Sequence, residues 1–234
     1  MDQFSLAGKV IVVTGGTGII GKSFIKGITE AGGAVGILGR NETVANERAE
    51  EVIKNGGKAI ALIADVLDEN AVEVAKDQIL TAFGKIDGLV NAAGGNIPEA
   101  VIQKDADVFA LNMDGMRKAM DLNLWGTLIP TQVFGKAMAA TGKGSIVNIS
   151  SMSSKRAITK VLGYSMGKAA IDCYTQWFAV ELANRFGDKV RMNAIAPGFI
   201  ETEMTDVLDP KVKAEWENGI PLKRAGKSED VANA

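Results

Sequence analysis

The chain has 234 residues, of which 47% are hydrophobic and 23% are charged, as is typical of one globular domain and not of a disordered chain. Its formal net charge is −2 and no basic block stands out, so the electrostatic footprint of a nucleic-acid-binding protein is missing. Histidine is absent, which excludes Ser–His–Asp catalysis and leaves carboxylate, lysine, tyrosine or cysteine for any proton transfer.

The single cysteine, Cys173, rules out an internal disulfide, so a reducing compartment fits best. The apolar run at 10–13 is short, and no basic segment precedes a long apolar stretch. We therefore expect a cytoplasmic protein with neither a signal peptide nor a membrane span, and no metal site.

Short β-branched runs alternate with longer helical patterns along the chain. Strands are predicted at 9–14, 35–38, 59–64, 86–90, 144–149 and 190–195. Helices are predicted at about 18–31, 43–54, 69–83, 116–140 and 163–186. Residues 96–115 are expected to form a loop, and the pattern weakens after Pro197. The alternation predicts a single α/β domain over 1–234, with a doubly wound parallel sheet of the Rossmann type and helices on both faces.

A glycine-rich turn, TGGTGIIG at 14–21, follows the first strand and opens the first helix. Residues 16–21 satisfy G-x-G-x-x-G, a pattern that lets the backbone approach a pyrophosphate at a helix N-terminus. Its position favours a dinucleotide site over a glycine-rich turn without a ligand. The residues expected to contact the cofactor here are Gly15, Thr17, Gly18, Ile20 and Gly21.

Two further strand ends carry candidate cofactor contacts, because ligands of such sheets bind at the carboxyl ends of the strands. Asp65 and Val66 follow the third strand, and Asn91, Ala92 and Ala93 follow the fourth. Small residues would let an adenine ring or a ribose lie against the strand end, although each segment alone is more often an ordinary turn.

Tyr164 and Lys168 stand four positions apart in a predicted helix and so share one face. A nearby ammonium favours the phenolate, so Lys168 is expected to lower the pKa of Tyr164 from about 10 toward neutrality. Such a pair alone is usually a tyrosine covering a lysine stem. Ser151, however, follows the fifth strand thirteen positions before the tyrosine, where a strand end and a helix start can converge.

On these residues the chain resembles the short-chain dehydrogenase/reductase family over nearly its whole length. The elements that carry the resemblance are the 14–21 turn, Asp65-Val66, NAAG at 91–94, Asn123 in DLNLWGT, Ser151, Tyr164, Lys168 and Pro197-Gly198. The resemblance implies an NAD(P)-dependent oxidoreductase that interconverts a secondary alcohol and a ketone.

The resemblance also implies roles for single residues. Tyr164 would exchange a proton with the reacting oxygen, Ser151 would hydrogen-bond that oxygen, and Lys168 would bind the nicotinamide ribose. Asn123 would hold a proton-relay water. The residues expected to meet the nicotinamide amide are Pro197, Gly198, Ile200 and Thr202.

The chain departs from the family pattern at two places. Ile19 occupies the second glycine of T-G-x-x-x-G-x-G, so details of pyrophosphate binding are expected to differ. The sequence stops at Ala234, within what reads as the helix before a last strand. The resemblance therefore implies that the last strand and the C-terminal tail are missing.

The residue at the end of the second strand indicates whether NAD or NADP is preferred. An acid there favours NAD, and an arginine accommodates the 2′-phosphate of NADP. Arg40 and Asn41 stand there, and no acid is present. NADP(H) is therefore favoured, with NAD(H) possible if Arg40 merely stacks on the adenine.

The segments 92–96 and 121–134 are similar to bacterial mannonate (fructuronate) oxidoreductases, with gluconate dehydrogenases nearby. A sugar acid or polyol is therefore the expected substrate. Asn96 would suit a polyol beside Ser151, and Lys155 or Arg156 could meet a carboxylate unless both are simply solvated.

Two alternatives remain at this point. A 3-oxoacyl thioester reductase would need an apolar slot and a basic patch for a carrier protein, and no such patch is evident in the sequence. A non-catalytic cofactor-binding regulatory protein is disfavoured because Ser151, Tyr164 and Lys168 are all present.

The helices predicted at 116–140 and 163–186 carry more apolar residues than one core-facing stripe needs. We expect these helices to pair across a two-fold axis into a homodimer or homotetramer, although burial against the chain's own sheet takes part of the same surface. The residues concerned are Trp125, Phe134, Cys173, Trp177 and Phe178.

Overall fold

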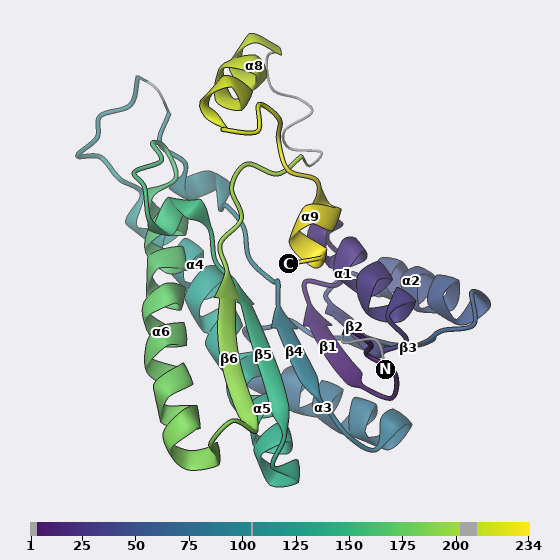
Figure 1. Cartoon of the computed structure of the whole chain (residues 1–234). Helices are drawn as coiled ribbons and strands as arrows, with labels where there is room; N and C mark the ends of the chain where they lie inside the picture. Colours follow the sequence, from purple (N-terminus) through teal and green to yellow (C-terminus); the bar gives the residue numbers. More distant parts are fainter. Residues whose placement is uncertain (1–3, 104, 202–209) are drawn as a thin grey trace.

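A computed structural model of the chain describes residues 4–103, 105–201 and 210–234 (Figure 1). Its centre is a six-stranded parallel sheet in the order β3-β2-β1-β4-β5-β6. The strand order reverses between β1 and β4, so the switch point of the sheet lies where these two strands end. The strands are β1 (Val10–Thr14), β2 (Ala34–Gly39), β3 (Lys58–Ile63), β4 (Gly88–Asn91), β5 (Gly144–Ile149) and β6 (Val190–Ile195).

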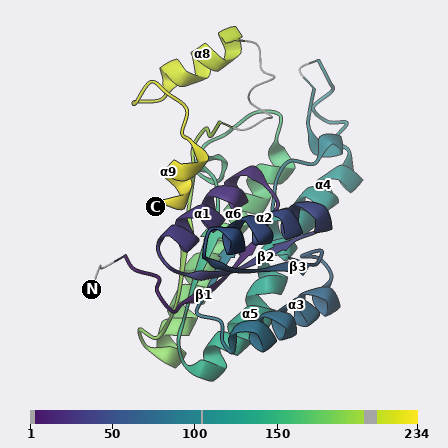
Figure 2. The ribbon, with the colours of Figure 1, turned by 90° about the vertical axis from the view of Figure 1, so that its right-hand side faces the viewer.

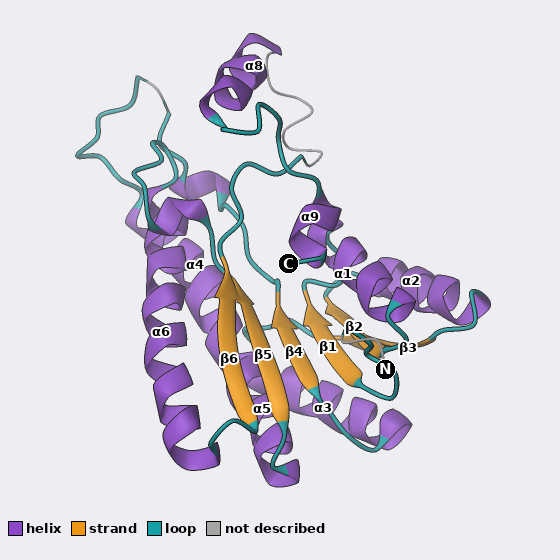
Figure 3. Cartoon of the chain, viewed as in Figure 1, coloured by secondary structure: helices purple, strands orange, loops and turns teal. Residues whose placement is uncertain are grey.

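Helices cover both faces of the sheet, as the doubly wound prediction requires. Figures 1 and 2 show α1 (Ile19–Glu30) and α2 (Glu42–Lys54) on one face, and α3 (Glu69–Phe83) and α5 (Gly126–Thr141) on the other. The long α6 (Leu162–Phe186) lies on the same face as α5, and α9 (Ser228–Ala232) packs beside α1. A further helix, α8 (Pro210–Gly219), lies above the carboxyl ends of the strands (Figure 3).

Alternating strand residues divide the core into two apolar layers. Val10, Val12 and Leu38 point into the layer beneath α3, α5 and α6. Ile11 and Val13 point into the layer beneath α1 and α2. Because both faces of the sheet are covered, β1 reads as the continuous apolar run VIVVT and all five of its residues are buried.

The helix predicted at 116–140 is interrupted. α4 (Met113–Met120) is followed by a π-helical turn over Asp121–Trp125, and only then by α5. α4 begins three residues before the expected start because the Asn112 side chain accepts a hydrogen bond from the Gly115 amide, 2.9 Å away. The expected loop at 96–115 also contains a short 3-10 turn at Pro98–Ala100.

The apolar residues expected at a subunit interface separate into two groups. Phe134 is fully buried in the core, so that expectation was wrong for this residue. Trp125 and Trp177 are 50% and 60% exposed, and Cys173 is exposed as well. Phe178 is partly buried against the core. Among the described residues, no helix combines the length and the hydropathy needed to cross a bilayer.

Candidate active site

Three of the expected catalytic residues meet at the carboxyl end of β5. Ser151 lies two residues beyond the strand, at the start of a one-turn 3-10 helix, η3 (Met152–Ser154). Tyr164 and Lys168 lie on the first turns of α6 and share one face of it. The Nζ atom of Lys168 lies 5.5 Å from the centroid of the Tyr164 ring, and Ser151 hydrogen-bonds the Tyr164 hydroxyl. The structure thus brings the strand end and the helix start together as the spacing predicted.

The expected lowering of the tyrosine pKa is not found. Burial raises the pKa of Tyr164 above its ordinary value of 10.0, and the hydrogen bond from Ser151 offsets only part of this rise. Burial is thus the dominant cause, and the Lys168 ammonium, which donates to the carbonyl oxygen of Ile149 at 2.7 Å, is not among the groups that lower the tyrosine pKa. Tyr164 therefore carries its proton at neutral pH.

Lys168 is one of the most deeply buried charged groups of the described chain, with 4% of its surface exposed. Burial lowers its pKa from 10.5 to about 8, and the nearby carboxylate of Asp172 opposes this shift. The ammonium has three N–H donors, and the Ile149 carbonyl takes one of them. The remaining donors suit the hydroxyl groups of a ribose.

Asn123 lies inside the π-helical turn and is fully buried. Its amide nitrogen donates to the carbonyls of Gly95 and Ala119 at 2.8 and 2.9 Å, and its oxygen accepts from the Gly95 amide at 3.1 Å. The side chain therefore fastens the loop after β4 to the helix beside Lys168. Its role toward a relay water stays a prediction.

Gly94 leaves open space next to the lysine. A Cβ atom at this position would lie 2.9 Å from Asn123 Oδ1 and 3.1 Å from Lys168 Nζ, and the φ angle of +158° is one that side-chain-bearing residues rarely adopt. Any larger residue would fill the space around the ammonium. The site therefore fits a bound nicotinamide ribose, which Lys168 would hold.

The backbone of the glycine-rich turn packs so closely against its neighbours that side chains would not fit at two of its glycines. A Cβ at Gly15 would meet the backbone oxygen of Ala92 at 2.7 Å, and one at Gly21 would meet the Gly15 oxygen at 2.3 Å. Gly18 precedes α1 without any side-chain cap, so the first amide groups of this helix stay free for an anion. Thr17 and Ile20 lie on the same turn and are partly buried. This arrangement suits a pyrophosphate.

Arg48, which sequence reasoning missed, supports this turn from α2. Its guanidinium donates to the carbonyl oxygens of Gly16 and Gly18, the latter 2.7 Å away. The arginine stands seven residues after Asn41, on a helix that the motif does not include. No feature of the motif points to it.

The Asn91 side chain points into the protein, so the cofactor contact predicted for this residue would come from its backbone. The side chain is 1% exposed and donates to Thr131 Oγ1 and Asn148 Oδ1 at 2.8 and 2.9 Å. Asn148 in turn donates to Thr175 on α6 at 2.9 Å. Asn91 therefore belongs to a buried polar chain that joins β4, β5 and α6. Its neighbours Ala92 and Ala93 are partly exposed at the strand end, as a cofactor contact needs.

Thr14 ties the two loops of the switch point together. Its hydroxyl oxygen accepts hydrogen bonds from the amides of both Ala92 and Ala93, each at 3.1 Å. The residue belongs to the glycine-rich motif, yet its role depends on the neighbouring strand and is not visible in the motif alone.

The adenosine end of the site carries Arg40 and Asp65. Arg40 lies just beyond β2, is 76% exposed at its side chain, and stands 3.6 Å from the Asp65 carboxylate. Asp65 also accepts from the Leu67 amide at 3.0 Å. Asn41 serves first as the cap of α2, because its side-chain oxygen accepts from the Val44 amide at 3.1 Å. Val66 places its side chain in the core, so only its backbone can face a cofactor.

The segment after β6 comes close to the catalytic turn. The Met152 amide donates to the Pro197 carbonyl at 2.9 Å, so this segment is fixed beside Ser151. Gly198 is exposed, and a Cβ there would meet nothing within 4 Å. Ile200 forms an isolated bridge with Gly226. Thr202 lies outside the described residues.

A cavity of about 780 Å³ borders the catalytic turn, between residues 102–108 and 153–165. Arg156 and Lys160 line it, and none of its described lining residues is acidic. Lys155 also lines it, but this lysine pairs with Asp172 at 2.8 Å. Asn96 lies exposed on the loop after β4. A larger cavity of about 1060 Å³ lies along the sheet between Lys9 and Ala234. Ser151, Tyr164 and Lys168 line neither cavity, but the smaller one lies next to them in the chain, at Ser153, Ser154 and Ser165.

Comparison with known proteins identifies the family of the chain. A family model described as enoyl-(acyl carrier protein) reductase matches residues 17–234. The chain belongs to the short-chain dehydrogenase/reductase family. Membership makes it a nicotinamide-dependent oxidoreductase that acts on CH–OH groups, which is the function predicted from the sequence.

Relatives and solved structures cover nearly the whole chain. An uncharacterized oxidoreductase of Bacillus subtilis, UxuB, is 36% identical over 97% of this chain and 86% of its own length. A 3-oxoacyl-[acyl-carrier-protein] reductase of Chlamydia pneumoniae is also 36% identical, over 98% of this chain and 89% of its own.

Among solved structures, a candidate D-mannonate oxidoreductase from Haemophilus influenza with bound NAD is similar at a TM-score of 0.87. It is 34% identical, and the match covers 98% of this chain and 87% of that one. A gluconate 5-dehydrogenase from Burkholderia cenocepacia, in complex with NADP and tartrate, has a TM-score of 0.88 and 31% identity over 99% and 88% of the two chains.

Proposed function

We propose that this short-chain dehydrogenase/reductase interconverts a secondary alcohol and a ketone on a sugar acid or a related polyol. The observation that carries the substrate class is the cavity beside the catalytic turn, whose lining carries the guanidinium of Arg156 and the ammonium of Lys160. An acidic substrate would gain from two cations without a lining carboxylate to compete. The names of two structural relatives, which refer to mannonate and gluconate, support the same class.

The geometry of the gathered side chains supports the proposed catalytic roles. Tyr164 holds its proton at neutral pH because burial raises its pKa, so it can donate that proton to a ketone oxygen during reduction. Ser151, hydrogen-bonded to the same hydroxyl, would orient the substrate oxygen. Lys168 would hold the ribose, while the bound nicotinamide supplies or accepts the hydride.

Of the two basic residues first considered for a substrate carboxylate, Arg156 is the better candidate. Both residues line the cavity, but the Lys155 ammonium is already paired with Asp172. Arginine also binds carboxylates in a bidentate geometry that lysine cannot provide. Asn96, exposed on the opposite loop, would meet a hydroxyl of the substrate.

The preferred cofactor in this proposal is NADP(H), with NAD(H) as the second possibility. Arg40 lies exposed just beyond β2, where a 2′-phosphate would stand, and its pairing with Asp65 at 3.6 Å is exposed and weak. The solved relatives bind either cofactor, one with NAD and one with NADP.

The proposal extends to assembly and location. Trp125 on the π-helical turn and Trp177 on α6 leave about half of their surfaces exposed, which suits pairing of these helices in a homodimer or homotetramer. A single exposed cysteine fits a reducing, cytoplasmic setting.

The test is turnover measured by absorbance at 340 nm. Purified protein with NADP⁺ or NAD⁺ is mixed with D-mannonate, D-gluconate, mannitol and simple secondary alcohols, beside Tyr164→Phe as a control. Arg156→Ala should raise the KM for the sugar acids about tenfold and leave that for mannitol unchanged, because only the acids carry a carboxylate. Equal effects on acids and mannitol would contradict the assignment of Arg156.

A second candidate is a 3-oxoacyl thioester reductase, which the 36% identical Chlamydia relative favours. Acetoacetyl-CoA with NADPH tests it directly. Turnover of this thioester together with no turnover of any sugar acid would replace the first proposal by the second.

A further inference from the structure

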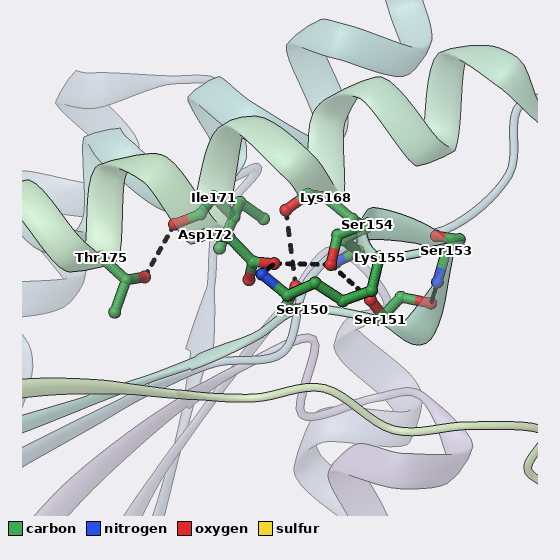
Figure 4. Close-up of polar contacts among 9 residues, drawn as sticks. All are labelled: Ser150, Ser151, Ser153, Ser154, Lys155, Lys168, Ile171, Asp172 and Thr175. Atoms are coloured by element: carbon green, nitrogen blue, oxygen red, sulfur yellow. Dashed lines mark hydrogen bonds and ion pairs between the residues drawn. The ribbon is translucent and has the colours of Figure 1, made fainter. Parts of the chain in front are cut away.

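The proposed reaction does not by itself account for one mostly buried carboxylate. Asp172 lies on α6 four residues after Lys168 and eight after Tyr164, so all three lie along one side of the helix. Its side chain is 11% exposed. It accepts from Ser154 Oγ at 2.5 Å and from Lys155 Nζ at 2.8 Å (Figure 4).

Two partners of Asp172, Ser154 and Lys155, stand at the end of the turn that carries Ser151, and a third, Ser150, stands at its beginning. The beginning of this turn is held by the sheet side, where the Ser150 amide donates to the Ile195 carbonyl at 2.8 Å. The far end of the turn contacts α6 through Ser154 and Lys155, which both bind Asp172. Residues 156–160, which follow the turn, are exposed. Figure 4 shows the carboxylate between α6 and the turn.

The Ser154 hydroxyl connects Asp172 with Ser151 itself. Its oxygen lies 2.5 Å from the carboxylate and 2.7 Å from the Ser151 carbonyl oxygen. One hydroxyl has one proton, and the carboxylate is the stronger acceptor because its hydrogen bonds are charge-assisted. The Ser154 hydroxyl therefore donates its hydrogen bond to the Asp172 carboxylate, which stays ionised and holds the turn against α6.

We propose that Asp172 is a positioning residue, whose carboxylate clamps the Ser151 turn against α6 so that the Ser151 hydroxyl stays in contact with Tyr164. Burial alone would raise the pKa of Asp172, but hydrogen bonds from Lys155, Ser150 and Ser154 outweigh it and hold this pKa below its ordinary value. The group is therefore a charged clamp at neutral pH.

This inference rests on the proposed role of Ser151, so both are tested in one series. The variants are Asp172→Ala, Asp172→Asn and Ser151→Ala, together with the double variant Ser151→Ala/Asp172→Ala. Their kcat is measured with D-mannonate and NADP⁺, and cofactor affinity by fluorescence. Asp114→Asn is the matched control, because this aspartate is 85% exposed and pairs only with its neighbour Arg117 among the described residues.

Asp172→Ala should lower kcat about tenfold to a hundredfold, the cost of a displaced reacting group, with cofactor affinity unchanged. Asp172→Asn should lose no more than about fivefold, because its amide still bonds Ser154 with a neutral hydrogen bond. In the Ser151→Ala background, Asp172→Ala should have no further effect on kcat. The proposal would be overturned if Asp172→Asn and Asp172→Ala lowered kcat equally. It would also be overturned if Asp172→Ala lowered kcat as much in the Ser151→Ala background as in the wild type.

A second measurement needs no substrate. Amide hydrogen exchange of residues 152–155 should be faster in Asp172→Ala than in the wild type, and close to the wild type in Asp172→Asn and Asp114→Asn. Unchanged exchange in Asp172→Ala would overturn the clamp even if D-mannonate is not a substrate. If Ser151→Ala has full activity while exchange responds as expected, the proposed role of Ser151 fails and the clamp does not.

Discussion

The side-chain nitrogen of Lys168 donates a hydrogen bond to the carbonyl oxygen of Ile149, the last residue of β5, at a distance of 2.7 Å. A lysine on a helix is thereby fixed to the end of a strand. The contact sets the ammonium beside the Tyr164 ring and Gly94, at the depth where a ribose is proposed to bind.

Replacing Lys168 by methionine should stabilise the protein at pH 7 while it lowers cofactor affinity. The folded pKa is about 8 and the ordinary value is 10.5, so burying the charge costs about 3 kcal/mol below pH 8. In the variant the Ile149 carbonyl loses its donor, which reduces this stabilisation by about 1 kcal/mol. Urea unfolding at pH 7 measures the difference, with the exposed Lys136→Met as control.

The same shift predicts a pH dependence. Between pH 8 and 10.5 the unfolded chain holds the Lys168 proton and the folded chain does not, so this group makes the free energy of unfolding rise with pH. The rise should be smaller in Lys168→Met than in the wild type. Identical pH slopes for the two proteins would contradict the lowered pKa.

Replacing Tyr164 by phenylalanine should lower kcat about 10²- to 10⁴-fold and leave cofactor affinity intact, because it removes only the proton donor. Turnover at 340 nm and cofactor fluorescence measure the two effects. Tyr174→Phe is the matched control, since Tyr174 is the other of the two tyrosines and packs against Phe178 in the core region. Comparable losses in both variants would argue against Tyr164 as the donor.

Arg40→Ala should weaken NADP⁺ binding about tenfold and leave NAD⁺ binding nearly unchanged, because only NADP⁺ carries a phosphate at this position. Fluorescence titration with each cofactor gives the ratio. Arg117→Ala, an exposed arginine on α4, serves as control. A wild-type protein that already prefers NAD⁺, with no change in Arg40→Ala, would show that Arg40 does not select the cofactor.

Arg48→Ala should weaken the binding of both cofactors about tenfold, since the loss of its hydrogen bonds to Gly16 and Gly18 releases the glycine-rich turn. An equal effect on NAD⁺ and NADP⁺ separates this role from that of Arg40. Arg185→Ala is the control, because Arg185 pairs with Glu181 at the exposed end of α6. Affinities like those of the wild type would mean that the turn holds its shape alone.

Thr14→Val should destabilise the protein by about 1–2 kcal/mol and weaken cofactor binding, because the Ala93 amide loses its acceptor and the Ala92 amide keeps only the Val90 carbonyl. The two side chains have the same shape, so packing is preserved. Urea unfolding gives the stability, with the partly exposed Thr29→Val as the comparison. A change below about 0.5 kcal/mol would show that other groups satisfy these amides.

Much of the fold follows directly from the apolar pattern. The strand at Gly144–Ile149 and the start of α6 match the predicted residues within one position, because their apolar runs end at clear breaks. The π-helical turn at Asp121–Trp125 could not be predicted, since its apolar residues fit a continuous helix equally well. The loop after β4, which holds this turn through Gly95, is distant in the sequence.

Some features of the site could likewise be predicted from the sequence and others could not. The positions of Ser151, Tyr164 and Lys168 follow from spacing, because helix and strand geometry fix them. The inward turn of Asn91 and the raised pKa of Tyr164 depend on burial and on contacts between distant segments. Asp172 lies at helical spacing from Lys168, which is a visible signal, but its partner turn could not be placed from the sequence.

The π-helical turn also fixes how far α5 is rotated about the helix axis relative to α4. In an α-helix each residue advances the rotation by about 100°, so one extra residue in the turn reorients everything that follows it. Deleting a single residue between Asp121 and Trp125 would leave a regular helix, but α5 would rotate and carry Phe134 away from the core that it fills. The buried asparagine and the apolar face of α5 are thus compatible only through this one irregular spacer.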